Sequence, residues 1–130
     1  MKAKENIKLY TNNRIAKLQG ENDFDGIIAV ADEMLAVNPQ DALAQKIRLQ
    51  ALFDKKDYAG VIASAEEAAA GQTDEEERSD VYFILGAAYN ARTMPQQAID
   101  ALSKVTAGAN VAAAQKTVAQ LKENAAKANS

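Results

Sequence analysis

The densest group of chemically active side chains in this 130-residue chain is the acidic run at 74–77, Asp-Glu-Glu-Glu. Adjacent carboxylates could bind a metal cation or a basic partner. Neighbouring residues of a helix point about 100° apart, however, so four in a row cannot close around one ion. Acidic side chains are also favoured at the positive end of the helix dipole. We therefore predict that the acidic run is a solvated first turn of a helix and that it holds no metal.

The chain contains no cysteine and no histidine. The absence of cysteine excludes disulfides, thiolate nucleophiles and cysteine-based zinc sites. The absence of histidine removes the side chain most often used for acid–base catalysis near neutral pH. An enzyme would have to rely on carboxylates alone, and the sequence contains no paired constellation of them. We therefore predict a protein that is not an enzyme and that needs no cofactor.

Fifteen basic and eighteen acidic residues give the chain a net charge of −3, and the basic residues are scattered. Because phosphate binding needs a clustered positive field, we predict no nucleic-acid partner. Residues 1–14 lack the apolar stretch of a secretory signal, and no stretch approaches the ~18 apolar residues of a membrane span. The chain as written is predicted to be cytoplasmic. A leader removed beforehand would place it outside the cytoplasm, so the compartment stays open.

Apolar residues recur with helical periodicity along the chain, and no strand pattern is evident. They make up 48% of the residues, but only three Phe and four Tyr are present and there is no Trp. The core must therefore come from close contacts between helices. Aspartates at 23 and 57, a capping box from Thr73 to Glu76, and Pro95 mark helix starts. These signals predict an all-α protein with seven helices, over about 4–19, 23–38, 41–53, 57–71, 74–92, 95–105 and 110–127.

Two segments of the chain are nearly the same. Residues 23–35 read DFDGIIAVADEML and residues 57–69 read DYAGVIASAEEAA, an offset of 34 positions. A third unit has Tyr82, Leu85, Gly86 and Tyr89, followed by Ala98. A helix-turn-helix unit that recurs every 34 residues resembles the tetratricopeptide repeat family, and the third unit has that family's residue spacing. The interval to this unit grows to 37, and we expect the three extra residues to lengthen the connection at 70–79.

The resemblance implies a right-handed α-solenoid of three helical hairpins with a C-terminal capping helix. Residues 1–130 would form a single domain with repeats at about 4–39, 41–71 and 74–107 and the capping helix at about 110–127. Each hairpin uses its neighbour as part of its core, so the last hairpin needs a cover. We expect Val111, Val118 and Leu121 to dock on it.

Small residues are expected where two helices of a hairpin approach closely. In the third unit the resemblance assigns this contact to Gly86 and Ala98. In the first two units the corresponding pairs are large, and Gly26 and Gly60 stand one position away. We interpret these two glycines as taking over the close contact, the alternative being that they are first-turn glycines that the helix tolerates.

In the family, the first helices of the hairpins line a concave groove that holds an extended peptide or a partner's helix. Carrying those positions across predicts a mixed surface whose amide groups can hydrogen-bond a peptide backbone. Phe53 and Phe83 would be anchors, or would instead fill the seam between units. Lys46, the single cation, is interpreted as a solvated helix residue. The candidate partner-binding residues are Asn12, Gln19, Leu43, Lys46, Gln50, Phe53, Phe83 and Asn90.

We accordingly predict a non-enzymatic interaction module, or scaffold, that binds a peptide or partner segment in this groove. The alternative is a structural role in which the solenoid forms a homodimer or larger assembly through its exposed first helix, around Ile7 and Leu9. The sequence does not encode the identity of the partner.

Overall fold

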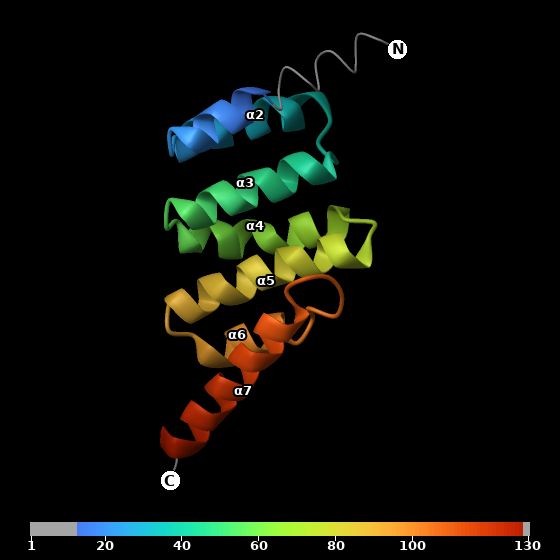
Figure 1. Cartoon of the computed structure of the whole chain (residues 1–130). Helices are drawn as coiled ribbons and strands as arrows, with labels where there is room; N and C mark the ends of the chain where they lie inside the picture. Colours follow the sequence, from blue (N-terminus) through green and yellow to red (C-terminus); the bar gives the residue numbers. More distant parts are fainter. Residues whose placement is uncertain (1–12, 129–130) are drawn as a thin grey trace.

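A computed structural model describes residues 13–128, which form helices joined by short connections and contain no strand (Figure 1). The prediction of an all-α protein is confirmed for this part of the chain. The first predicted helix is seen from residue 13 and continues to residue 20. The helices that follow are α2 (Phe24–Val37), α3 (Ala42–Asp54), α4 (Tyr58–Gly71), α5 (Glu75–Ala91), α6 (Pro95–Leu102) and α7 (Val111–Ala128).

The helices are stacked in chain order. Each helix from α2 to α6 packs against the helix that follows it, and α3 also contacts α5. Figure 1 shows the result as an elongated row that runs from α2 at one end to α7 at the other. Contacts therefore join near neighbours in the row, and no central core gathers all the helices.

The same backbone turn reverses the chain three times. Its key residue has a positive φ, 55° at Asn22, 69° at Lys56 and 57° at Thr93. The next residue's amide then donates to the carbonyl five positions back, from Asp23 to Leu18 at 2.9 Å, Asp57 to Leu52 at 2.8 Å and Met94 to Tyr89 at 2.9 Å. A left-handed residue followed by this bond is the Schellman ending of a helix. The turns lie 34 and 37 positions apart, so the repeat in the sequence is also a repeat in the backbone.

Aspartate side chains cap the N-termini of α2, α3, α4 and α5. The Asp23 and Asp57 carboxylates accept from the amides of Gly26 and Gly60, both at 3.0 Å, as the sequence predicts. The prediction of a capping box that starts at Thr73 is wrong, because Asp74 caps α5 by accepting from the Glu76 amide at 2.9 Å. Aspartate is at least as good an N-cap as threonine, and one residue cannot cap while its neighbour does.

The three extra residues of the third unit lie in a helix. The connection between α4 and α5 spans only residues 72–74, whereas α5 has 17 residues and α3 has 13. The prediction that they lengthen the connection at 70–79 is therefore wrong. They extend α5 at its N-terminus, where acidic side chains favour helix. At the other end of the unit, α6 stops at Leu102, before the predicted 105.

The core consists largely of alanine and β-branched or leucine side chains. One cluster joins α3, α4 and α5 around Leu49, Val61 and Val81, which are almost fully buried. A second cluster contains Leu102, Val105 and Ala114, and it joins α6 to α7. Val111, Val118 and Leu121 pack against this second cluster, as the sequence predicts for the last helix.

Gly86 lies where α5 and α6 approach each other closely. A Cβ atom at this position would lie 2.5 Å from the Leu102 side chain and 3.4 Å from the Leu102 amide nitrogen. At Gly26 an added Cβ would meet Leu18 of the preceding helix at 2.8 Å and the capping carboxylate of Asp23 at 2.7 Å. At Gly60 it would meet the side chain of the cap alone. The predicted close contact therefore holds for Gly26 and fails for Gly60, where the glycine leaves room for the N-cap aspartate.

We predict that Gly86→Ala lowers the free energy of unfolding by about 1–3 kcal/mol, because the added methyl forces Leu102 and α6 away from α5. Chemical denaturation measures this. Gly20→Ala is the matched control, since nothing lies within 4 Å of an added Cβ there. It should leave stability unchanged or raise it by up to about 1 kcal/mol. Equal effects of the two variants would contradict the close approach.

We also predict that deleting residues 108–130 abolishes the cooperative thermal melt or causes aggregation, because Leu102, Val105 and Phe83 lose the cover that α7 provides. Truncation after Lys122 is the control, since residues 123–128 are exposed and none of them contributes to the second cluster. An unchanged melt for the longer deletion would show that α7 is not needed as a cap.

Candidate functional site

Residues 13–20 and helices α2, α3 and α5 border a cavity of about 270 Å³, which we call the groove. Four of the predicted partner-binding residues line it together, namely Gln19, Leu43, Lys46 and Gln50. Leu43 is 43% exposed, a large value for an apolar side chain that lines a concavity. The other lining residues are Ile27, Ile47, Ala51, Asp54 and Glu77.

The remaining predicted residues lie elsewhere. Phe53 is half-buried in the first core cluster, where its ring meets Tyr58 edge-on with centroids 5.6 Å apart. Phe83 is half-buried against the second cluster. Asn90 is exposed in a separate cleft between α5 and α7. Asn12, like Ile7 and Leu9 of the self-assembly alternative, lies outside the described residues. The structure thus favours a packing role for both phenylalanines, and their role in binding stays a prediction.

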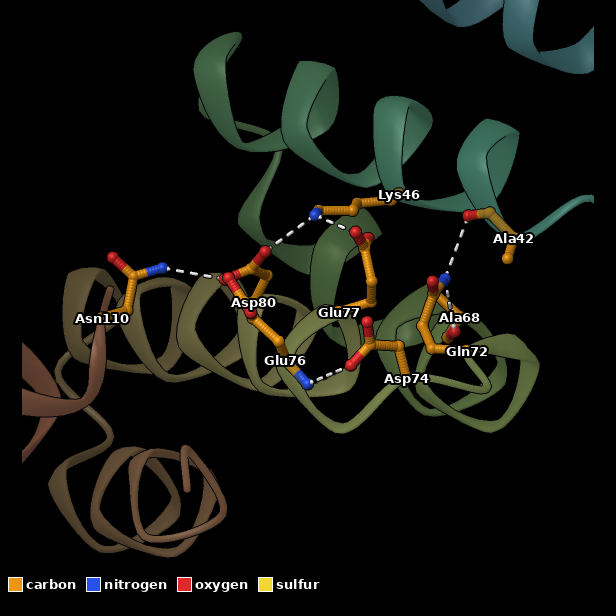
Figure 2. A network of polar contacts seen from close by, with 9 residues as sticks. All are labelled: Ala42, Lys46, Ala68, Gln72, Asp74, Glu76, Glu77, Asp80 and Asn110. Carbon is orange, nitrogen blue, oxygen red and sulfur yellow. Dashed lines mark hydrogen bonds and ion pairs between the residues drawn. The ribbon is translucent and has the colours of Figure 1, made fainter. Parts of the chain in front are cut away.

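Lys46 of α3 is the electrostatic centre of the groove. Its Nζ lies 2.9 Å from Glu77 Oε2 and 2.7 Å from Asp80 Oδ2, both on α5 (Figure 2). Only 25% of its side chain is exposed. The interpretation of Lys46 as a solvated helix residue is therefore wrong. Glu77 and Asp80 lie 31 and 34 positions away in the sequence, and α3 and α5 must both be in place before the three groups meet.

The environment of Lys46 keeps it charged. Partial burial alone would lower the pKa of Lys46, but the hydrogen bonds that Lys46 donates to Asp80 and Glu77, together with the negative charges of these two carboxylates, outweigh burial and raise that pKa above its usual 10.5. The amine is thus fully protonated at neutral pH. Asp80 is anchored on its other side as well, because the Asn110 side-chain amide donates to Asp80 Oδ1 at 3.1 Å. Figure 2 shows Asp80 between Lys46 and Asn110.

Two further buried polar side chains join neighbouring elements. The buried Gln72 amide donates to the carbonyls of Ala42, at 3.0 Å, and Ala68, at 3.1 Å, so it ties α3 to the end of α4 (Figure 2). The buried Ser79 hydroxyl oxygen accepts from the amides of Thr106 and Ala107, so it ties α5 to the segment before α7. These bonds satisfy buried polar groups at both junctions.

The sequence did not indicate Asp54 and Glu77 as groove residues. Asp54 is exposed at the end of α3, and the Gln50 amide donates to it at 3.0 Å. Glu77 is the last residue of the acidic run, and it turns towards α3, whereas Glu75 and Glu76 stay exposed in the first turn of α5. The predicted solvated turn is thus confirmed for Glu75 and Glu76, whereas Glu77 lies in the same turn with 47% of its side chain exposed and also pairs with Lys46, which the sequence did not indicate. The i to i+4 spacing of Gln50 and Asp54 is the one local signal that could have placed Asp54 beside a predicted groove residue.

Comparison of the chain with models of known protein families gives no match, and comparison with curated proteins gives no significant match. The resemblance to tetratricopeptide repeats therefore stays a prediction from the residues themselves. Among residues 13–128, no group of three or more acidic side chains is arranged to hold a metal ion. In the same part of the chain, no helix has the length and apolar content needed to cross a bilayer.

We predict that Lys46→Met lowers the free energy of unfolding at pH 7 by about 1 kcal/mol, because Glu77 and Asp80 lose their cation and repel each other. The folded-state pKa of Lys46 is raised, so its stabilising effect is complete below the unfolded-state value and disappears as the pH rises through the folded-state value. The difference between variant and wild type should therefore narrow above pH 10.5. Urea denaturation at several pH values measures both effects.

Lys55→Met serves as the control for this measurement. Lys55 also pairs with a carboxylate across helices, at 2.7 Å, but its partner Asp25 is 80% exposed. Solvent screens such a pair, so the variant should melt almost as the wild type does. If Lys55→Met lowers the free energy of unfolding as much as Lys46→Met does, burial of the Lys46 cluster does not contribute to its stabilising effect.

Proposed function

We propose that the chain is a tetratricopeptide-like α-solenoid, a right-handed superhelix of three hairpins capped by α7. Three observations support this architecture. Identical Schellman turns recur at intervals of 34 and 37, neighbouring helices pack in chain order, and α7 covers the last hairpin. The hairpins are residues 13–37, α3 with α4, and α5 with α6.

We further propose that the protein is a non-enzymatic interaction module that binds an extended segment of another protein in the groove. The observation that carries this proposal is the position of Leu43. It is one of only two large apolar side chains that are strongly exposed among the described residues, and it lines the same cavity as the exposed Gln19 and Gln50. An apolar anchor beside amide donors and acceptors suits a peptide, which offers both side chains and backbone groups.

The volume of the groove suits anchoring side chains of a protein segment. At about 270 Å³, the groove has room for the anchoring side chains of a longer segment whose remainder stays outside. Leu43 and Ile47 stand one helical turn apart on α3 and together offer the apolar part of that contact.

We predict that a random peptide library displayed on phage yields binders to the protein, and that Leu43→Ser weakens their binding at least about tenfold. A buried leucine contact is worth about 1.5–3 kcal/mol, and each 1.4 kcal/mol changes the dissociation constant tenfold. Fluorescence anisotropy with the recovered peptides measures the affinities, and thermal melting checks that the variant is folded.

The matched control is Val37→Ser, which removes the other strongly exposed apolar side chain, 88% exposed at the end of α2 and outside the groove lining. It should bind the recovered peptides as the wild type does. Recovery of no peptide, or equal weakening by the two variants, would refute binding in the groove.

A further inference from the structure

We propose that the groove selects partner segments in which a lysine or arginine stands next to an apolar side chain. This inference rests on the proposed function and adds the chemistry of the partner. Three features of the groove support it. Two carboxylates line the groove, its lysine is already paired with acidic side chains, and apolar side chains lie beside these charges.

Lys46, the cation of the groove lining, is already paired with acidic side chains. Lys46 Nζ lies within 2.9 Å of both Glu77 and Asp80, so two carboxylates face one ammonium group. An anionic ligand that approached Lys46 would have to displace one of them or meet their negative charge. The groove is therefore unsuited to a carboxylate or phosphate ligand. The groove residues predicted from the sequence include only the lysine and neither of the acids beside it.

Two carboxylates of the groove lining keep acceptor capacity for a partner. Each carboxylate has two oxygens and about four lone-pair positions. Glu77 is bonded to Lys46 through Oε2, and 47% of its side chain remains exposed. Asp54 is exposed and accepts one bond, from the neutral Gln50 amide, through Oδ1. Within the described residues, no cation is paired with Asp54. The lining thus combines one neutralised lysine with two carboxylates that can each accept further hydrogen bonds.

The apolar part of the groove lies next to these acids. Leu43 and Ile47 are on α3, one helical turn apart, and Glu77 faces Lys46, the residue before Ile47. Asp54 lies two turns further along α3. The distance from Leu43 to Asp54 along the helix is about 16 Å, at ~1.5 Å per residue. An extended segment of about five residues covers that length, so one short segment can reach the apolar anchor and both carboxylates.

The experiment uses three peptides that differ only in charge beside a central leucine. Each has the sequence Gly-X-Ser-Leu-Ser-X-Gly with blocked ends, and X is lysine, serine or glutamate, because alternate side chains of an extended segment face the same way. Titration of the isotope-labelled protein, followed by NMR, reports which amides shift and at what peptide concentration. We expect the amides of Leu43, Ile47 and Gln50 to shift. The lysine peptide should bind at least about threefold more tightly than the serine peptide, and the glutamate peptide most weakly.

The variant Asp54→Asn/Glu77→Gln removes both charges and keeps an oxygen that can accept from Gln50 and Lys46. It should bind the three peptides equally, and added salt should reduce the preference of the wild type. Glu66→Gln, which removes an exposed carboxylate of α4 outside the groove lining, should keep the full ranking.

The outcomes separate this inference from the proposed function. Equal affinities of the three peptides for the wild type, with shifts at Leu43 and Gln50, would overturn the charge preference and leave binding in the groove intact. A ranking that survives in Asp54→Asn/Glu77→Gln would also overturn it, because other groups would then supply the preference. The absence of groove shifts with every peptide would contradict both proposals.

Discussion

The structure depends on how closely neighbouring helices can approach. Helices α2, α3, α4 and α6 have 14, 13, 14 and 8 residues, and isolated helices shorter than about 12–15 residues are marginal in water. They persist because each packs on the next, and the contacts form through small residues. Ala31, Ala44, Ala65, Ala88, Ala98 and Ala114 are all fully buried. An alanine buries little apolar area, so its value lies in the short distance between helix axes, which brings the larger side chains of both helices into contact.

Short-range signals in the sequence predicted the helices and their reversals well, because caps and turns depend on adjacent residues. Asp23 and Asp57 cap the helices they precede, and the interval between repeats reappears in the positive-φ residues Asn22, Lys56 and Thr93. The failures occurred where two local solutions compete. Thr73 and Asp74 can each cap α5, and the extra residues of the third unit can extend either a loop or a helix. Nothing in a single sequence weighs these against each other, whereas the packing of α5 between its neighbours does.

Long-range positions were predicted less evenly. The resemblance to the repeat family predicted Gln19, Leu43, Lys46 and Gln50 as groove residues, and these four side chains do line one cavity. It could not show what those side chains contact. Phe53 turns into the core beside Tyr58, and Lys46 bonds to α5, since a long side chain has several rotamers and its partner is chosen by the neighbouring unit. The position of the candidate groove was therefore predicted from the sequence, but the excess of acidic side chains in its lining was not.

The Lys46 cluster connects stability with the proposed recognition. Its ion pairs cross from α3 to α5, between the second and third hairpins, and Asn110 extends the same cluster to the segment that begins α7. The contacts that hold successive hairpins together are thus the ones that neutralise the only lysine of the groove and leave the acids in excess. A mutation that weakens this junction changes the spacing of α3 and α5 and the electrostatic potential of the groove at once. The features shared between repeats, namely the turns and the aspartate caps of α2 and α4, serve the fold. Lys46, Asp54 and Glu77 are not shared between the repeats, and their charges determine which partners the groove can accept.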